Sequence, residues 1–240
     1  MEMEIPSLTA EQMKQVDSLA VKFFGVDMLQ LMENAGRNVA EVARIVLGKL
    51  KGKEITVLCG KGNNGGDGLV TARFISNWGA KPKVILACHP DELSGQNRAQ
   101  LGVLRSMFVE ILHLINSYQF EGAIKKADLI IDGLIGYNIE GDPRGLYSQL
   151  IEFTNQNAKK VLAIDIPSGL NPDTGQPYNS CIKADATITF CLPKKGLLEK
   201  SAKDFVGKLY LGDIGVPYEV FEKMGLKPPK VFEERALLKL

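Results

Sequence analysis

The sequence predicts an α/β protein, namely a three-layer α/β/α sandwich around a mostly parallel sheet, with two helices at its N terminus. Two observations carry this prediction. From residue 54 onward, short apolar runs rich in β-branched residues alternate with amphipathic stretches, which is the pattern of βαβ units. Most of the apolar runs are too uniform to be half exposed, which indicates strands that helices cover on both faces.

The two N-terminal helices are predicted from a start signal and an apolar stripe. Residues 9–12 (TAEQ) fit a capping box, and Gly25 is expected to stop the first helix. The second helix is expected to begin near Asp27. Its apolar residues recur every three or four positions on one face; they are Met28, Met32, Ala35, Val39, Val42 and Val46.

After these helices, strands and helices alternate within one domain. The expected strands span residues 55–59, 84–88, 129–132, 161–166, 186–190 and 209–211. The expected helices between them span residues 69–78, 98–107, 120–126 and 146–155. Because 240 residues suit one large domain, we expect residues 1–227 to form it and residues 228–240 to be a C-terminal tail or connector.

The composition excludes several classes of protein. With 29 basic and 28 acidic side chains and no basic tract, the chain lacks the charge of a nucleic-acid binder. No apolar run approaches the ~20 residues of a membrane span, and the start Met1-Glu2-Met3-Glu4 is acidic, unlike a signal peptide. The four cysteines show no CxxC spacing and are expected to be buried thiols. We therefore expect a cytoplasmic protein with no nucleic-acid or membrane partner.

Glycine is the one compositional excess, at 24 of 240 residues. Eleven of these glycines lie in three polar loops at residues 60–68, 133–145 and 167–175, each directly after an expected strand, and a fourth such loop spans 192–196. Ligands of open parallel sheets bind outside the carboxyl ends of the strands. Glycine permits a positive φ or a close backbone approach, so these loops predict a ligand site at one rim of the sheet.

The first loop carries a phosphate-binding pattern. Gly60, Gly62 and Gly65 satisfy G-x-G-x-x-G between a strand and a helix, whose N terminus offers free N–H groups. This pattern first indicates a nicotinamide-dependent dehydrogenase. Two features argue against that class: Asp67 would crowd a pyrophosphate unless it binds hydroxyls, and the expected acidic residue about 20 positions on is at best Asp91, which is late. A plain tight turn needs fewer than the five glycines present.

Charged and polar residues follow the other strands. Asp132 ends an apolar run, and Asp165 interrupts another, where an unpaired carboxylate would be costly to bury. Asp165 must therefore meet a cation, hydrogen-bond donors or a substrate. A purely structural role, capping the helix that begins near residue 144, fits Asp142 better than Asp132. Ser168 either acts in the site or holds a Pro-Ser-Gly turn, and Lys194 either reaches the same rim or is solvated.

Together these stretches resemble the YjeF N-terminal domain family, whose enzymatic members are NAD(P)H-hydrate epimerases. The resemblance covers nearly the whole chain, and the motifs that carry it are residues 31–36 (LMENAG), 62–68 (GNNGGDG), 132–136 (DGLIG), 165–169 (DIPSG) and 186–190 (ATITF). It implies a Rossmann-like fold, a homodimer, and interconversion of the R and S epimers of hydrated NADH or NADPH. It also implies a functional partner, an NAD(P)HX dehydratase, which is fused to the epimerase in bifunctional members.

The resemblance also implies site residues. Those implied to line the substrate are Asn63, Asn64, Gly65, Gly66, Asp67, Gly136, Tyr137, Asn138, Ile139, Glu140, Gly141, Asp142 and Asp165. Those implied to hold a potassium ion are Asn64, Asp132 and Ser168. Amide, carboxylate and hydroxyl oxygens are hard ligands suited to an alkali or alkaline-earth cation, which agrees with that assignment. The loop at residues 136–138 (GYN) departs from the Gly-Thr-Gly pattern of many members.

The chemistry of epimerisation indicates a role for Asp165. Ring nitrogen can expel the hydroxyl of the hydrate to give an iminium, which water attacks again from either face. A carboxyl group that donates and then accepts a proton suits this reaction, and we predict Asp165 as the catalytic residue. Two alternatives stay open: a non-catalytic nucleotide-binding or scaffold module of the same fold, and a dehydrogenase. The preference between the two hydrates is also open, with Arg73 and Lys194 as candidates for a 2′-phosphate.

Overall fold

The computed structural model describes residues 5–113 and 120–240, so the acidic start at residues 1–4 lies outside the described residues. The strands are β1 Glu54–Cys59, β2 Lys81–Leu86, β3 Glu110–His113, β4 Leu129–Gly133, β5 Val161–Ile164, β6 Ala186–Phe190, β7 Lys208–Gly212 and β8 Leu237–Lys239. The α-helices are α1 Ala10–Lys22, α2 Met28–Leu47, α3 Asn63–Asn77, α4 Gly95–Ser106, α5 Glu121–Lys126, α6 Leu146–Asn157, α7 Lys203–Val206 and α8 Glu219–Lys223. Short 3₁₀ turns span Pro90–Glu92, Lys195–Leu198 and Lys200–Ala202.

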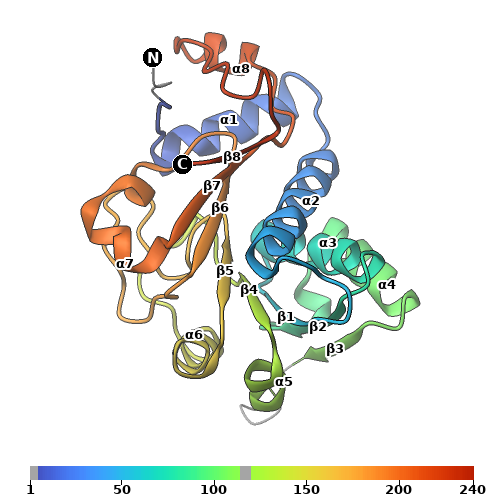
Figure 1. The fold of residues 1–240 in the computed structure, drawn as a ribbon. Helices are drawn as coiled ribbons and strands as arrows, with labels where there is room; N and C mark the ends of the chain where they lie inside the picture. The colour runs from blue at the N-terminus through green and yellow to red at the C-terminus, as the bar shows by residue number, and fades with distance from the viewer. Residues whose placement is uncertain (1–4, 114–119) are drawn as a thin grey trace.

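The strands form one sheet in the order β3-β2-β1-β4-β5-β6-β7-β8. Strands β1 to β7 are parallel, and β8 pairs antiparallel with β7 at the edge. In Figure 1, α3 and α4 cover one face of the sheet and α5 and α6 the other. This arrangement confirms the predicted α/β class. The chain order reverses between β1 and β4, which is the switch point where ligands of such sheets bind.

The central strands β1, β4, β5 and β6 are buried on both faces, as their uniform apolar runs indicate, whereas the edge strands β3 and β8 are partly exposed. In β1, Val57 packs with the residues of α2 and α3, whereas Leu58 packs with those of α5 and α6. The same alternation holds in β5, where Leu162 and Ala163 belong to opposite faces. Adjacent strand residues point to opposite faces, so the two apolar layers hold the sheet between them.

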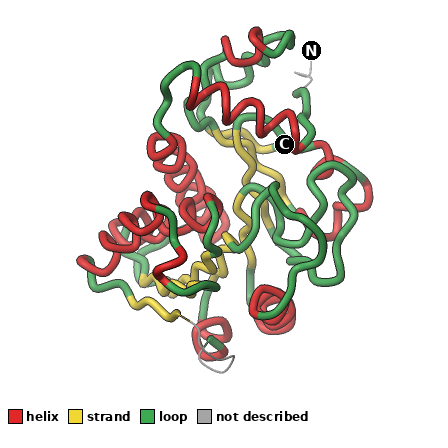
Figure 2. Tube along the Cα trace, turned by 180° about the vertical axis from the view of Figure 1, so that it is seen from behind, coloured by secondary structure: helices red, strands yellow, loops and turns green. Residues whose placement is uncertain are grey.

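The N-terminal helices begin as predicted. Thr9 Oγ1 accepts from the Gln12 backbone N–H at 3.1 Å, and Gln12 Oε1 accepts from the Thr9 N–H at 2.9 Å, which completes the capping box of α1. Asp27 caps α2 by accepting from the Leu29 N–H at 2.7 Å. Between the two helices Gly25 has a φ of +73°, a conformation that glycine adopts without steric cost. Figure 2 shows both helices from the opposite side of the molecule.

The glycine-rich segment differs from its prediction. Helix α3 begins at Asn63 rather than near residue 69, so most of the expected loop is helical. None of its five glycines has a positive φ. They are needed for close packing instead: a Cβ on Gly60 would lie 2.0 Å from the Leu134 carbonyl oxygen, and one on Gly65 would lie 1.9 Å from the Gly60 carbonyl oxygen. The start of α3 is therefore packed tightly against the rim of the sheet.

The end of the chain also differs from expectation. The sequence places residues 228–240 outside the domain, but Leu237–Lys239 form β8. The strand pairs along β7 and packs Leu237 and Leu238 against the core. Strand β3 and the short helices α7 and α8 were also not predicted, because they are short and lack a clear apolar period. All four cysteines are free and buried, as expected. In the described ranges, no helix is both long and apolar enough to cross a membrane.

Candidate active site

A pocket of about 480 Å³ opens at the carboxyl ends of the parallel strands. Its walls come from α1, α2, the start of α3 and the loops that follow β1, β4, β5 and β6. The pocket therefore lies at the switch point between β1 and β4, where the loops with the glycine excess converge. This is the rim at which the sequence predicts a ligand site.

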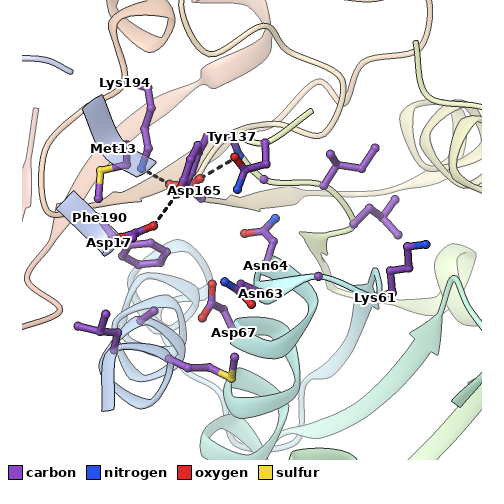
Figure 3. Close-up of a pocket in the computed structure, with 18 of the residues that line it drawn as sticks. Met13, Asp17, Lys61, Asn63, Asn64, Asp67, Tyr137, Asp165, Phe190 and Lys194 are labelled. Atoms are coloured by element: carbon purple, nitrogen blue, oxygen red, sulfur yellow. Dashed lines mark hydrogen bonds and ion pairs between the residues drawn. The ribbon is translucent and has the colours of Figure 1, made fainter. Parts of the chain in front are cut away.

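Asp165 enters the pocket from the end of β5 through an unusual turn. Its φ is +67°, and the turn is closed by a 2.8 Å hydrogen bond from the Ile166 N–H to the Ile164 carbonyl, as in a γ-turn. A non-glycine residue in this conformation is strained, and such residues gather at functional sites. The residue is only 6% exposed and lines the pocket. The turn directs a buried carboxylate away from the strand and toward the ligand space (Figure 3).

The Asp165 carboxylate is fully engaged by donors, as the cost of burying it requires. Lys194 Nζ forms an ion pair with Oδ1, and Thr189 Oγ1 donates to the same oxygen at 3.4 Å. The Tyr137 backbone N–H donates to Oδ2 at 3.3 Å. Lys194 is 1% exposed, so it reaches the rim and is not solvated. Because the Asp165 carboxylate already offsets its charge, Lys194 is a poor candidate for binding a 2′-phosphate.

Two further carboxyl groups line the same pocket. Asp17 of α1, which no sequence pattern singles out, accepts a hydrogen bond from the Tyr137 hydroxyl. Burial raises the pKa of Asp17 despite this bond. Burial and the negative charge of Asp165 raise the pKa of Asp67 well above its usual range. Burial together with the charge of Asp17 raises the pKa of Tyr137. The pocket therefore favours the neutral forms of these groups around the ion pair.

Only some of the substrate-lining residues predicted at the start of α3 line the pocket. Asn63, Asn64 and Asp67 line it, while Gly65 and Gly66 lie behind them in the helix. The N-cap residue Gly62 has no side chain to satisfy the first N–H groups of the helix. These N–H groups and the positive end of the helix dipole suit an anionic part of a ligand.

Asp132 and Ser168 are fully buried and do not line the pocket, whereas Asn64 does. Ser168 Oγ donates to Asp132 Oδ1 at 2.7 Å, and the Ser168 backbone N–H donates to Oδ2 at 2.8 Å. Burial raises the pKa of Asp132 to about 6, while the hydrogen bonds from Ser168 oppose the shift. The side-chain oxygen and nitrogen of Asn64 are buried without a hydrogen-bond partner among the described residues. Buried oxygens of these types, one of them unsatisfied, fit a hard cation such as potassium.

The loop after β4 divides into two parts. Gly136, Tyr137 and Asn138 line the pocket, whereas the next four predicted residues do not; these are Ile139, Glu140, Gly141 and Asp142. Asp142 accepts hydrogen bonds at 2.9 Å from the backbone and side-chain nitrogens of Asn179. The expectation that it caps the following helix is wrong, because the N-cap of α6 is Gly145.

Two basic residues that could bind phosphate differ in their position relative to the pocket. Arg144 lines the pocket. Arg73, a candidate for a 2′-phosphate, forms an ion pair with Glu33 and does not line the pocket. The basic residues at the pocket that are not committed to a buried ion pair are thus Arg144 and the exposed Lys61.

The sheet order, the switch-point pocket and the glycine-packed helix start define a doubly wound, Rossmann-like α/β protein. The family model described as YjeF-related protein N-terminus matches residues 28–196. The chain belongs to this family.

Comparison with curated proteins gives two informative relatives. The chain is 32% identical to the NAD(P)H-hydrate epimerase of Rhodopirellula baltica, over 93% of the chain and 90% of that relative. It is 38% identical to the Bifunctional NAD(P)H-hydrate repair enzyme Nnr of Moorella thermoacetica, over 89% of the chain. The match spans only 41% of that bifunctional relative. The chain thus corresponds to one part of the bifunctional protein and to most of the epimerase.

A solved structure shows the same fold. The crystal structure of yeast ynu0, YNL200c, superposes with a TM-score of 0.84 at 24% sequence identity. The alignment covers 98% of this chain and all of the yeast chain. At that level of identity the likeness establishes the architecture, including the arrangement of elements around the rim.

Proposed function

We propose that the chain is an NAD(P)H-hydrate epimerase that interconverts the R and S epimers of hydrated NADH and NADPH. The observation that carries the proposal is Asp165, a buried carboxylate turned into the switch-point pocket by a strained residue and held there by Lys194 and Tyr137. The relatives named as epimerases match nearly the whole chain, which supports the same activity.

The pocket provides for both ends of such a substrate. Apolar side chains of α1 and α2, among them Met13 and Met32, line the same pocket as Asp165 and would pack against the nicotinamide ring. The start of α3 and Arg144 offer N–H groups and positive charge to the phosphates. The nicotinamide ring then lies against Asp165, where a carboxylate stabilises the cationic iminium that forms when the hydroxyl leaves.

A potassium ion is part of the proposal. Asn64, Asp132 and Ser168 would hold it, and its charge would offset that of Asp132 and of the ligand phosphates. Residues 132–136 and 168 include no basic side chain that could offset this negative charge instead. In this arrangement the chain itself orders the loops after β4 and β5 through the Ser168–Asp132 hydrogen bonds.

The remaining parts of the proposal concern partners and location. We infer a homodimer in the cytoplasm that supplies its product epimer to an NAD(P)HX dehydratase. The names of the bifunctional relatives, which describe NAD(P)H-hydrate repair, support the link to a second repair step. Light scattering coupled to size exclusion tests the dimer, and the coupled assay below tests the link.

The decisive experiment mixes the purified chain with R-NADHX and a dehydratase specific for the S form. Conversion of the R form faster than with the dehydratase alone is the expected result, and an unchanged rate refutes the proposal. Incubation with NAD⁺ and a panel of alcohols and hydroxy acids serves as the control for dehydrogenase activity. No absorbance of reduced nicotinamide is expected to develop.

A further inference from the structure

Lys194 is a buried lysine at the reacting end of the pocket. Its ammonium group donates to Asp165 Oδ1 and, at 3.2 Å, to Thr189 Oγ1. An ammonium has three donors, and among the described residues only these two hydrogen bonds use them. Since Lys194 also lines the pocket, its third N–H is available to a ligand (Figure 3).

Backbone hydrogen bonds on both sides of Lys194 hold its segment in place. The Leu8 N–H donates to the Pro193 carbonyl and the Lys195 N–H donates to the Leu8 carbonyl, both at 2.9 Å. This parallel bridge joins the segment before α1 to the loop after β6 on both sides of Lys194. Nζ also lies 5.3 Å from the centre of the Tyr137 ring. A lysine buried at this cost and held this firmly is suited to a role in the reaction.

We propose that Lys194 is the proton donor and acceptor of the epimerisation and that Asp165 remains ionised throughout. This inference rests on the proposed function. It differs from the sequence-based role of Asp165 because the leaving hydroxyl needs a donor, and both Asp165 oxygens already accept hydrogen bonds, from Lys194, Thr189 and the Tyr137 N–H. The Lys194 ammonium is a donor that lines the same pocket.

The step balances as follows. The lone pair of ring N1 forms the N1=C6 double bond as the C6–O bond breaks, and the departing hydroxyl takes a proton from Lys194 and leaves as water. The result is a neutral amine and a cationic iminium. Water then adds to either face of C6, its proton passes to the Lys194 amine, and the electron pair returns to N1.

The charge distribution favours this path. Asp165 faces the Lys194 ammonium before the bond breaks and the iminium afterwards, so the buried carboxylate always has one cation beside it. The other titratable groups near enough to interact with the charges of the pair include Asp17, Asp67, Tyr137 and Cys191. Asp17 is engaged by the Tyr137 hydroxyl, and Asp67 projects from α3 (Figure 3).

The test replaces the lysine by a cation that cannot give up a proton. An arginine keeps the positive charge but is not deprotonated in proteins. Lys194→Arg is expected to bind NADHX within about threefold of wild type and to lose about 10²–10⁴-fold in the epimerisation rate, the usual contribution of general acid–base catalysis. The matched control is Lys195→Arg, a change at the exposed neighbour, which is expected to keep the wild-type rate.

A second variant covers the case in which arginine does not fit the buried site. Folded Lys194→Ala is expected to regain rate with added methylamine or ethylamine, in proportion to amine concentration and in a manner that depends on the amine pKa. Wild-type activity of Lys194→Arg, or an Ala variant that amines do not affect, overturns the role of Lys194. If the wild type itself shows no epimerisation in the same assay, the proposed function is overturned instead.

Discussion

Ser168 binds Asp132 through two hydrogen bonds, one from its hydroxyl at 2.7 Å and one from its backbone N–H at 2.8 Å. The two residues are 36 positions apart, at the ends of the neighbouring strands β4 and β5. The Ser168 hydroxyl oxygen also accepts from the Ile135 N–H at 2.9 Å. This contact joins the two loops that carry Tyr137 and Asp165 into the pocket, so the geometry of the site depends on it.

Replacing Ser168 by alanine is expected to destabilise the fold. The change removes one donor to the buried Asp132 carboxylate, which keeps its bonds from the Ser168 and Leu134 N–H groups, and it removes the acceptor of the partly buried Ile135 N–H. A buried group left unsatisfied costs about 1–3 kcal/mol. Urea unfolding measures the loss. The control is Ser106→Ala in α4, where the hydroxyl is exposed and a change within about 0.5 kcal/mol is expected. Equal stability of the two variants would contradict the structural role of Ser168.

Potassium is expected to stabilise the protein through Asn64. At 100 times its Kd an ion adds about 2.7 kcal/mol, or about 5–10 °C in Tm for a domain of this size. Exchange of sodium for potassium at constant ionic strength should therefore raise the Tm of the wild type but not of Asn64→Ala. Asn63→Ala is the control, because Asn63 is exposed at the pocket and is not among the residues proposed to hold the ion. The same shift in both variants would exclude Asn64 as a ligand.

The glycines of α3 are expected to be required for packing rather than flexibility. Gly65→Ala would place a methyl group 1.9 Å from the Gly60 carbonyl oxygen, a contact that only a backbone shift relieves. A loss of about 3 kcal/mol or more is expected, at the upper end for overpacked sites. Gly102→Ala in α4 has open space and should add up to about 1 kcal/mol, the helix propensity difference. Thermal unfolding of both variants measures these changes in stability. A Gly65→Ala variant as stable as the wild type would refute the packing argument.

The sequence predicts the fold better than the contacts within the site. Uniform apolar runs indicate buried strands whatever their neighbours, which is why the core strands were found within a few residues of their bounds. Asp165 was also selected from local information, because a carboxylate in an apolar run must find partners. The identity of those partners depends on tertiary structure: Lys194 lies 29 residues from Asp165, and Asp17 lies 120 residues from Tyr137.

The glycine-rich segment at residues 60–68 shows the same limit of prediction from sequence. Its composition predicts an unusual backbone requirement, and the structure has one. Whether that requirement is a positive φ or a close approach depends on distances such as that between Gly65 and the Gly60 carbonyl, which no local pattern encodes.

Asp67 is expected to make the stability of the protein depend on pH. Burial and the charge of Asp165 raise its pKa in the folded state above that of the unfolded chain. As pH rises from the ordinary carboxyl range to the raised pKa, the unfolded chain loses its proton first, so the wild type loses stability over that window. Asp67→Asn removes this loss and should be more stable than wild type at neutral pH, with little difference near pH 4. Urea unfolding of both proteins across this range gives the difference. Asp91→Asn, at a carboxyl that is 86% exposed, is the control and should show no such trend. An advantage of Asp67→Asn that is the same at every pH would mean that ionisation of Asp67 does not cause it.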